Sequence, residues 1–316
     1  MMYYKIMKII YFGTDNNSKI VLDDIVRFGV KTELVITPPD SIKSRGKNKL
    51  PTAIKEYCLE NNLKYSHNIP SQKEIESLSP DLIIVASFGK IIPKTILDSP
   101  KYGAINLHPS LLPKHRGPSP VQTTLINDEK ITGTSIILLS DIVDGGPIIS
   151  QEKYKINNEY NNELTEKLFK IGSKLIKHIL KNPKIIFDAS YQIEKHATYT
   201  KKLNKTDGHI NWNLESRSIL QTIKALSEKP GTFSFLDNKK IKFFKASILK
   251  NSIQNEDPGV LGLNENNDLF VNTLNGKITL DEVQIEGKNK VKGSEFARGY
   301  KIYEIKNGNR TFKKLS

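Results

Sequence analysis

Residues 103–126, with the sequence GAINLHPSLLPKHRGPSPVQTTLI, decide the fold class. The apolar run Gly103–Leu107 predicts a buried strand, and Pro118–Ile126 predicts a helix. The loop between them is rich in proline, which interrupts both strands and helices. A strand that passes through a loop into a helix is half of a βαβ unit, from which parallel sheets are built.

The same alternation continues on both sides of this stretch, through residues 1–190. The expected strands are Lys8–Phe12, Thr32–Thr37, Asp81–Ala86, Gly103–Leu107 and Thr134–Leu139. The expected helices are Lys19–Phe28, Pro51–Glu60, Ser71–Leu78, Pro118–Ile126 and Leu164–Leu180. Helices between strands predict an α/β domain with a largely parallel sheet, and ligands bind at the carboxyl ends of such strands.

The pattern changes after residues 191–205, which we expect to form a linker. One helix is expected at Leu214–Leu226. The short β-like runs that follow are Gly231–Phe235, Lys240–Ile248, Gly259–Leu263, Asp268–Thr273 and Gly276–Ile285. Because Asn, Gly and Asp turns separate these runs, with no room for crossover helices, residues 206–316 are expected to form a small, mostly antiparallel barrel or sandwich.

The composition limits the class of protein. A chain of 316 residues with 37% hydrophobic and 26% charged residues is long enough for two folded domains and is unlike a disordered chain. Its single cysteine, Cys58, excludes an internal disulfide and any metal site built from several cysteines. No apolar run approaches the ~18 residues that span a bilayer. We therefore expect a cytoplasmic protein, of a bacterium or an organelle, without a membrane partner.

Basic residues outnumber acidic ones, 48 to 34, and the excess is uneven. Residues 1–200 carry a net charge of +6, whereas the shorter segment 201–316 carries +8. A lysine-rich, solvated surface explains such an excess, and so does an anionic partner such as a nucleic-acid backbone. The charge alone leaves both interpretations open.

The segment after the strand Gly103–Leu107 holds candidate catalytic groups. Asn106 and His108 are two residues apart, so on an extended backbone their side chains project to the same side. An amide donor beside an imidazole suits a reaction in which a carbonyl oxygen becomes negatively charged. Both residue types also occur at strand ends in purely structural roles. His115 follows in the same loop, but no third ligand has a regular spacing, so we expect no metal site.

A second strand-end turn, Asp141–Pro147, carries the carboxylates Asp141 and Asp144. A carboxylate beside an imidazole raises the pKa of the ring and fixes its orientation, so that it can act as an acid or a base near neutral pH. Taken by itself, the same sequence is also typical of an ordinary turn.

Together these segments resemble the folate-dependent formyltransferase family. The shared motifs, in the family's order and spacing, are Asn106-x-His108, Ser110-Leu-Leu-Pro113-x-x-Arg116-Gly117, Gly133 before a strand, and Asp141-x-x-Asp144-x-Gly146. The resemblance covers nearly the whole chain and is greatest to the members that act on aminoacyl initiator tRNA. It implies a Rossmann-like catalytic domain at residues 1–190 and a β-barrel (OB-like) tRNA-binding domain at 206–316.

The resemblance also implies an activity and roles for residues. A formyl group would pass from 10-formyltetrahydrofolate to the α-amine of methionyl initiator tRNA, for translation initiation. Asn106 would donate a hydrogen bond to the formyl oxygen, His108 would add positive charge, and Asp144 would hold His108 and help to move the proton of the amine. Neither a metal nor a covalent enzyme intermediate is implied, and we expect a monomer.

Two sets of binding residues follow from the resemblance. The folate is expected to contact Ser87, Phe88, Gly89, Lys90, Ser110, Leu111, Leu112, Pro113, Asp141, Gly145 and Gly146. The tRNA is expected to contact Lys43, Arg45, Lys47 and Lys49. As a bare charge run, the second set is also typical of a solvated loop.

The chain departs from the family's usual pattern at several places. After the first strand it has Thr14-Asp15-Asn16 where the family has Thr-Pro and an aromatic residue, and Ser41-Ile42 replaces Arg-Pro. His115 and Pro118-Ser119-Pro120 replace an aromatic residue and Ala-Ala-Pro, and the segment 227–231 lacks an expected tryptophan. None of these positions belongs to the three residues to which the resemblance gives catalytic roles, Asn106, His108 and Asp144, which we call the trio.

Other functions remain open from the sequence. A formyltransferase acting on an amino-sugar nucleotide, or a hydrolase of the formyl donor, would keep the same trio. The related glycinamide ribonucleotide enzyme needs only the first domain. A non-catalytic nucleic-acid-binding protein explains the basic second domain but not the trio. A nicotinamide enzyme is disfavoured because Gly13-Thr-Asp-Asn-Asn is no G-x-G-x-x-G motif.

Overall fold

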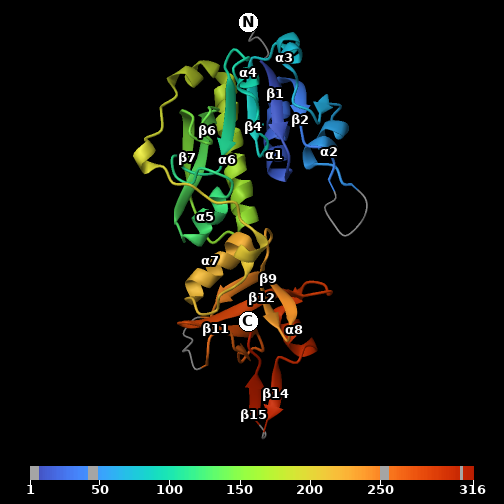
Figure 1. Ribbon diagram of the computed structural model, residues 1–316, viewed down its shortest axis with the longest axis vertical. Coiled ribbons are helices and arrows are strands. Elements are labelled where there is room, and N and C mark those ends of the chain that lie inside the picture. The colour runs from blue at the N-terminus through green and yellow to red at the C-terminus, as the bar shows by residue number, and fades with distance from the viewer. Residues whose placement is uncertain (1–6, 42–48, 250–255, 307–308) are drawn as a thin grey trace. The chain divides into compact units, whose positions relative to one another are not determined.

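The computed structural model describes residues 7–41, 49–249, 256–306 and 309–316 (Figure 1). By its contacts the chain divides into two compact units. The first unit comprises Met1–Pro120, Ile131–Ile156 and Leu164–Thr200, and the second comprises Val121–Lys130, Asn157–Glu163 and Lys201–Ser316. No helix among the described residues is both long and apolar enough to cross a membrane.

A seven-stranded sheet forms the centre of the first unit, in the order β3-β2-β1-β4-β5-β6-β7. The strands are β1 (Lys8–Gly13), β2 (Lys31–Ile36), β3 (Tyr65–Ser66), β4 (Leu82–Ala86), β5 (Ala104–His108), β6 (Ile131–Leu138) and β7 (Ile148–Lys155). Strands β1 to β5 pair in parallel, whereas β6 and β7 are antiparallel to their neighbours. The predicted α/β domain with a largely parallel sheet is confirmed, and β3 and β7 are additions that the sequence did not indicate.

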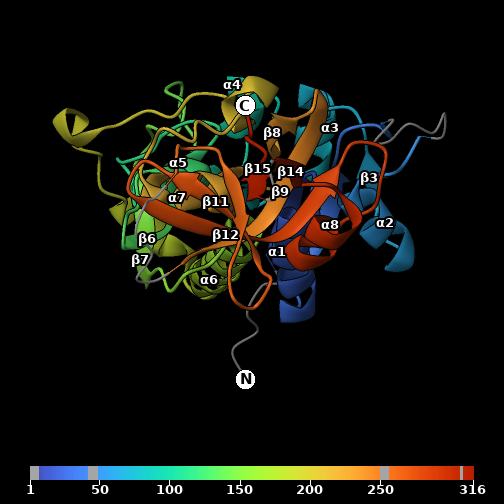
Figure 2. The ribbon, with the colours of Figure 1, turned by 90° about the horizontal axis from the view of Figure 1, so that it is seen from below.

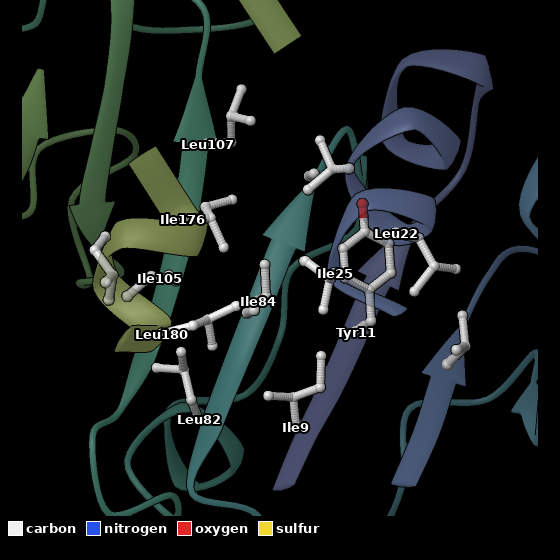
Figure 3. Close-up of a cluster of buried hydrophobic side chains, with 14 of the residues drawn as sticks. Ile9, Tyr11, Leu22, Ile25, Leu82, Ile84, Ile105, Leu107, Ile176 and Leu180 are labelled. Atoms are coloured by element: carbon white, nitrogen blue, oxygen red, sulfur yellow. The ribbon is translucent and has the colours of Figure 1, made fainter. Parts of the chain in front are cut away.

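Helices cover both faces of this sheet. They are α1 (Asn16–Phe28), α2 (Ala53–Glu60), α3 (Gln72–Leu78), α4 (Lys94–Leu97) and α6 (Asn161–Lys181), with 3-10 turns η1 (Pro183–Asp188) and η2 (Glu194–His196). Residues of α1, α2 and α6 form one buried cluster with alternate residues of the strands (Figure 3), and residues of α3 and α4 form another with the strand residues between them. This alternation is the expected period of a strand buried on both faces.

The alternation in β5 decides where its polar residues point. Ile105 and Leu107 belong to the cluster beneath α6 (Figure 3). Because successive side chains of a strand point to opposite faces, Asn106 and His108 lie on the other face of the sheet, at the carboxyl end of the strand. The packing of the core therefore orients both candidate catalytic side chains.

The second unit is built on an antiparallel sheet in the order β10-β11-β12-β9-β8, with β13 paired to β12. Figure 2 labels four of these strands, β8, β9, β11 and β12. Its strands are β8 (Thr232–Leu236), β9 (Lys239–Ile248), β10 (Leu261–Leu263), β11 (Leu269–Thr273), β12 (Gly276–Ile285), β13 (Val291–Lys292), and the hairpin β14 (Tyr303–Lys306) and β15 (Asn309–Phe312). Its helices are α5 (Pro120–Ile126), most of which belongs to this unit, α7 (Ser216–Leu226) and α8 (Gly293–Gly299), with the 3-10 turn η3 (Lys205–Gly208). The antiparallel β domain that the sequence predicts is confirmed.

Residues 313–316 pair with both edges of this sheet. The Leu261 N–H donates to the Lys313 carbonyl at 2.8 Å, and the Leu315 N–H donates to Gly259 at 2.8 Å. On the other edge, Phe235 and Ser316 exchange hydrogen bonds of 2.9 and 3.0 Å. A side chain at Gly259, where φ is +90°, would stand 2.7 Å from the Leu315 carbonyl, so this close approach requires glycine. The four residues thereby close the sheet between β10 and β8.

Asp128 explains why the segment Val121–Lys130 belongs to the second unit. Its carboxylate accepts hydrogen bonds from Arg217 Nε and Nη2 at 2.8 and 2.7 Å and from Gln221 Nε2 at 2.6 Å, both on α7. It also accepts one from Lys130 Nζ at 2.8 Å. The Arg217 guanidinium is the main reason why the pKa of Asp128 is lowered to about 2.

We expect Arg217→Gln to raise the pKa of Asp128 towards its usual 3.8. Because the pKa in the folded protein lies below the unfolded value, this carboxylate stabilises the fold above pH 3.8, and the effect is lost as the pH falls through about 2. Carboxyl NMR titration of both proteins measures the midpoint directly. Lys130→Gln, which removes a weaker partner, should shift it less; an unchanged midpoint in Arg217→Gln would contradict the assignment.

Candidate active site

Strand β5 places Asn106 and His108 between the parallel partner β4 and the antiparallel partner β6. His108 is buried, and Asn106 is half-buried. The side-chain amide of Asn106 makes no hydrogen bond with another described residue, so its donors are available to a ligand.

The imidazole of His108 lies between two oxygen atoms. Its Nδ1 is 3.5 Å from Asp144 Oδ1, and its Nε2 is 2.9 Å from the His115 carbonyl oxygen. Because a carbonyl oxygen only accepts hydrogen bonds, Nε2 carries a proton, and Nδ1 is the nitrogen that can gain one beside the carboxylate. Burial lowers the pKa of His108, and the Asp144 charge and the His115 carbonyl oppose that effect without cancelling it.

Asp144 is held in a conformation that few non-glycine residues adopt, with φ at +52°. Its Oδ2 accepts a hydrogen bond from the Gly117 N–H at 2.8 Å. Its carbonyl oxygen, like that of Gly146, accepts a hydrogen bond of 2.8 Å from Gln192 Nε2. A side chain at Gly146 would stand 1.8 Å from the Leu138 carbonyl oxygen, so the turn needs glycine there.

The loop 110–113 is fixed by hydroxyl groups. Ser110 Oγ donates to the Lys114 carbonyl at 2.7 Å. Ser135 Oγ donates to the Ser110 carbonyl at 2.6 Å and accepts from the Leu112 N–H at 3.1 Å. At Gly133, a Cβ atom would lie 2.2 Å from the Glu152 carbonyl oxygen and 2.4 Å from the Leu111 side chain, which gives this motif glycine a steric reason.

The loop 87–90 follows β4 and is tied to the start of α1. Ser87, with φ at +54°, donates from its hydroxyl to Asp15 Oδ2 at 2.7 Å. The Phe88 ring packs edge-on against Phe12, 5.2 Å between ring centres. Asp15, one of the departures from the family's pattern, therefore orients this loop.

Several exposed groups lie on the loops after β4 and β6. Lys94 Nζ lies 3.7 Å from Asp141 Oδ2, so an ion pair joins the start of α4 to the loop after β6. Ile91, Ile142 and Val143 are 93%, 58% and 73% exposed, respectively. These loops thus offer apolar and charged contacts to a ligand near the trio.

The structure brings His108 and Asp144 into contact and places Asn106 on the same strand. Lys49 is exposed, whereas Lys43, Arg45 and Lys47 lie outside the described residues. Among residues that are described, no group of three or more His, Cys, Asp or Glu side chains could hold a metal.

Two cavities of the first unit are lined by residues outside the candidate site. One, of about 590 Å³, is lined by residues of β3 and α3, and the other, of about 670 Å³, by residues such as Met7, Tyr102 and Leu180. Neither includes a residue that the sequence predicts for the site.

The segment 191–200, which the sequence assigns to a linker, contributes contacts that the sequence did not indicate. Arg116 is 1% exposed and bonds both carboxylate oxygens of Glu194 at 3.0 Å. It also donates to the Tyr199 hydroxyl at 3.0 Å and to Gln192 Oε1 at 3.1 Å. These contacts group the segment with the first unit; the domain boundaries at residues 190 and 206 stay a prediction.

Comparison with known proteins identifies two family models. The model described as formyl transferase matches residues 7–180, and the model described as formyl transferase, C-terminal domain, matches residues 202–301. A methionyl-tRNA formyltransferase from Thermodesulfovibrio yellowstonii is 39% identical over 303 residues, which cover 94% of this chain and 97% of the relative. One from Dictyoglomus thermophilum is 36% identical over 308 residues, with 94% and 98% covered.

Solved structures share the fold at lower identity. HypX from Aquifex aeolicus in complex with tetrahydrofolic acid has a TM-score of 0.66 and 16% identity, with 98% of this chain and 51% of that chain covered. WlaRD, a sugar 3N-formyl transferase, has a TM-score of 0.64 and 22% identity, with 90% and 100% covered. A methionyl-tRNA formyltransferase from Clostridium thermocellum has a TM-score of 0.53 and 19% identity, with 78% and 95% covered.

Proposed function

The chain belongs to the formyl transferase family, and from this we propose that it transfers a formyl group from 10-formyltetrahydrofolate to the α-amine of methionyl initiator tRNA. Enzymes of this family use folate-derived formyl donors. The relatives named as acting on methionyl-tRNA match over 94% of this chain, through both units. The assignment of methionyl-tRNA as the substrate therefore rests on similarity in the second unit as well as in the first.

The observation that carries the proposal is the pairing of His108 with Asp144 next to the free amide of Asn106. When the amine attacks the formyl carbon, negative charge develops on the formyl oxygen. Asn106 donates a hydrogen bond to that oxygen, and a protonated His108 adds positive charge nearby. Both groups act most strongly in the transition state, which is what acceleration of the chemical step requires.

A proton must also move during the transfer. The amine forms a new C–N bond while the C–N bond to the donor nitrogen breaks, and the proton lost by the amine ends on that nitrogen. Since Nε2 of His108 already donates to His115, the exchanging position is Nδ1, beside Asp144. The lowered pKa of His108 keeps the ring mostly neutral in the resting enzyme near pH 7, so that Nδ1 can accept the proton, with Asp144 stabilising the ion pair.

The formyl donor is proposed to bind against the loops around the trio. The residues we assign to it remain Ser87–Lys90, Ser110–Pro113, Asp141, Gly145 and Gly146. The exposed apolar side chains of Ile142 and Val143 beside Asp141 support this placement, because a flat aromatic ligand would remove them from water. Most of the remaining contacts would be made by backbone groups of these glycine-containing loops.

Basic groups on the second unit support an anionic partner. Lys240 Nζ lies 3.4 Å from the centre of the Phe233 ring, and His209 stacks beside that ring at 5.2 Å. Burial and the charges of Lys242 and Lys205 lower the pKa of Lys240. A phosphate group would relieve this repulsion, and aromatic rings next to lysines are typical of nucleic-acid surfaces.

We also propose that the basic segment around Arg45 contacts the tRNA, and expect Arg45→Ala to raise KM for the tRNA about tenfold while KM for the folate changes little. Steady-state kinetics with each substrate varied in turn separates the two constants. Arg27→Ala, which removes an exposed arginine from α1, is the matched control. An unchanged KM for tRNA would favour the interpretation of the basic segment around Arg45 as a solvated loop.

The proposed function is tested with labelled 10-formyltetrahydrofolate and three acceptors: charged methionyl initiator tRNA, free methionine and an amino-sugar nucleotide. Transfer to the charged tRNA alone is expected. Transfer to the sugar would retain the trio but overturn the substrate, and tRNA binding without transfer would favour a nucleic-acid-binding protein. The monomeric state and the cytoplasmic location stay predictions.

A further inference from the structure

Gln192 joins the turn that carries Asp144 to a buried arginine. Its Nε2 donates two hydrogen bonds of 2.8 Å, one to the Asp144 carbonyl and one to the Gly146 carbonyl. Its Oε1 accepts a hydrogen bond from Arg116 Nε at 3.1 Å. Both groups of the Gln192 side-chain amide are therefore hydrogen-bonded: the NH2 group bonds to the turn, and the oxygen bonds to the arginine.

These hydrogen bonds are made where the backbone of the turn enters the left-handed region. Asp144 has φ at +52°, a region that side-chain-bearing residues rarely adopt without help from their surroundings. The neighbouring side chains of Ile142 and Val143 are largely exposed, so they do little to hold the turn by packing. Gln192 is the described side chain that bonds two carbonyl groups of the turn at once.

The other end of this contact is a buried, multiply bonded arginine. The guanidinium of Arg116 is almost fully buried and forms a two-oxygen ion pair with Glu194, with a further bond to Tyr199. The next residue, Gly117, donates its N–H to Asp144 Oδ2. Gly117 thus binds the Asp144 carboxylate directly, and Arg116 binds Gln192, which in turn binds the Asp144 backbone carbonyl.

We propose that Gln192 is a positioning residue for the transfer reaction, which sets the place of the Asp144 carboxylate relative to His108. The proposal rests on the proposed function. Gln192 makes no hydrogen bond with the His108 ring; the ring contacts the Asp144 carboxylate and the His115 carbonyl, and the charge of the His115 side chain lowers the pKa of His108 further. Its effect on catalysis therefore passes through Asp144.

The test compares Gln192→Met, Gln192→Glu and the wild type. Methionine keeps the length of the side chain without its hydrogen bonds, and glutamate keeps the acceptor for Arg116 while losing both donors to the turn. We expect kcat to fall about 10- to 100-fold in both variants, the loss that a displaced catalytic group produces, with KM for both substrates within about twofold of wild type. Gln284→Met, which removes a glutamine–carbonyl bond to Lys288 in the second unit, is the matched control.

A second measurement separates positioning from a purely structural role. In Gln192→Met the Asp144 charge that raises the pKa of His108 is displaced, so the NMR titration of the His108 ring should move to lower pH. A lower Tm with wild-type kcat and an unmoved His108 titration would overturn the proposal. If the wild type transfers no formyl group to tRNA, the proposed function fails, whereas the titration still decides whether Gln192 positions Asp144.

Discussion

Replacing His108 by alanine is expected to lower kcat for formyl transfer by about 10³-fold or more. The variant loses the ring that carries positive charge near the formyl oxygen, and it loses Nδ1, the site that accepts the proton. Asn106 remains on the same strand, so KM for both substrates should change much less than kcat.

Single-turnover assays with charged initiator tRNA measure the chemical step in this variant. His178→Ala is the matched control, because it removes an exposed histidine from α6, away from the trio. A denaturant-unfolding curve shows whether the variant is folded. A folded His108→Ala protein with kcat within tenfold of wild type would exclude the mechanism proposed above.

Asp144→Asn is expected to lower kcat by about 10²- to 10³-fold, because the amide cannot stabilise a protonated imidazole. Asparagine retains an oxygen that can accept from the Gly117 N–H, so the turn is preserved. The carboxylate is the largest influence that raises the pKa of His108, and its removal leaves burial less opposed. The pKa of His108 should therefore fall further in this variant.

The pH dependence of stability follows with a definite sign. Since the pKa of His108 in the folded protein lies below its ordinary value of 6.5, the unfolded chain binds the proton more readily. The stability that comes from burying the neutral ring is present above pH 6.5 and is lost as the pH falls through the folded-state pKa. Asp144→Asn should extend this loss to lower pH, and a histidine titration that moves upward instead would contradict the role of Asp144.

The sequence predicts most of the first unit because its strands are buried on both faces. The core strands β1 and β4 contain continuous apolar runs, and β5 is apolar except for Asn106 and His108; such strands between helix-length segments are visible without a structure. The edge strands β3 and β7 cannot be recognised in this way. β3 has only two residues, and β7 has a largely polar sequence with no buried residue, which pairs through backbone groups.

The candidate site divides in the same way. Asn106 and His108 share one strand, so their common face follows from residue spacing alone. Gln192 reaches Asp144 from 48 residues away, through a segment with no periodic pattern. Only the folded backbone brings these groups together, which is why residues 191–200 are interpreted as a linker from the sequence.

The pairing of residues 313–316 with both β8 and β10 has a consequence for how the protein is made. During synthesis the first unit can complete its sheet long before these residues leave the ribosome, whereas the second unit still has two unpaired strand edges. Nascent chains that end before residue 313 would have a folded first unit and a second unit whose unpaired strand edges can associate with other chains. Translation of the codons for residues 313–316 is thus a step in the folding of the second unit.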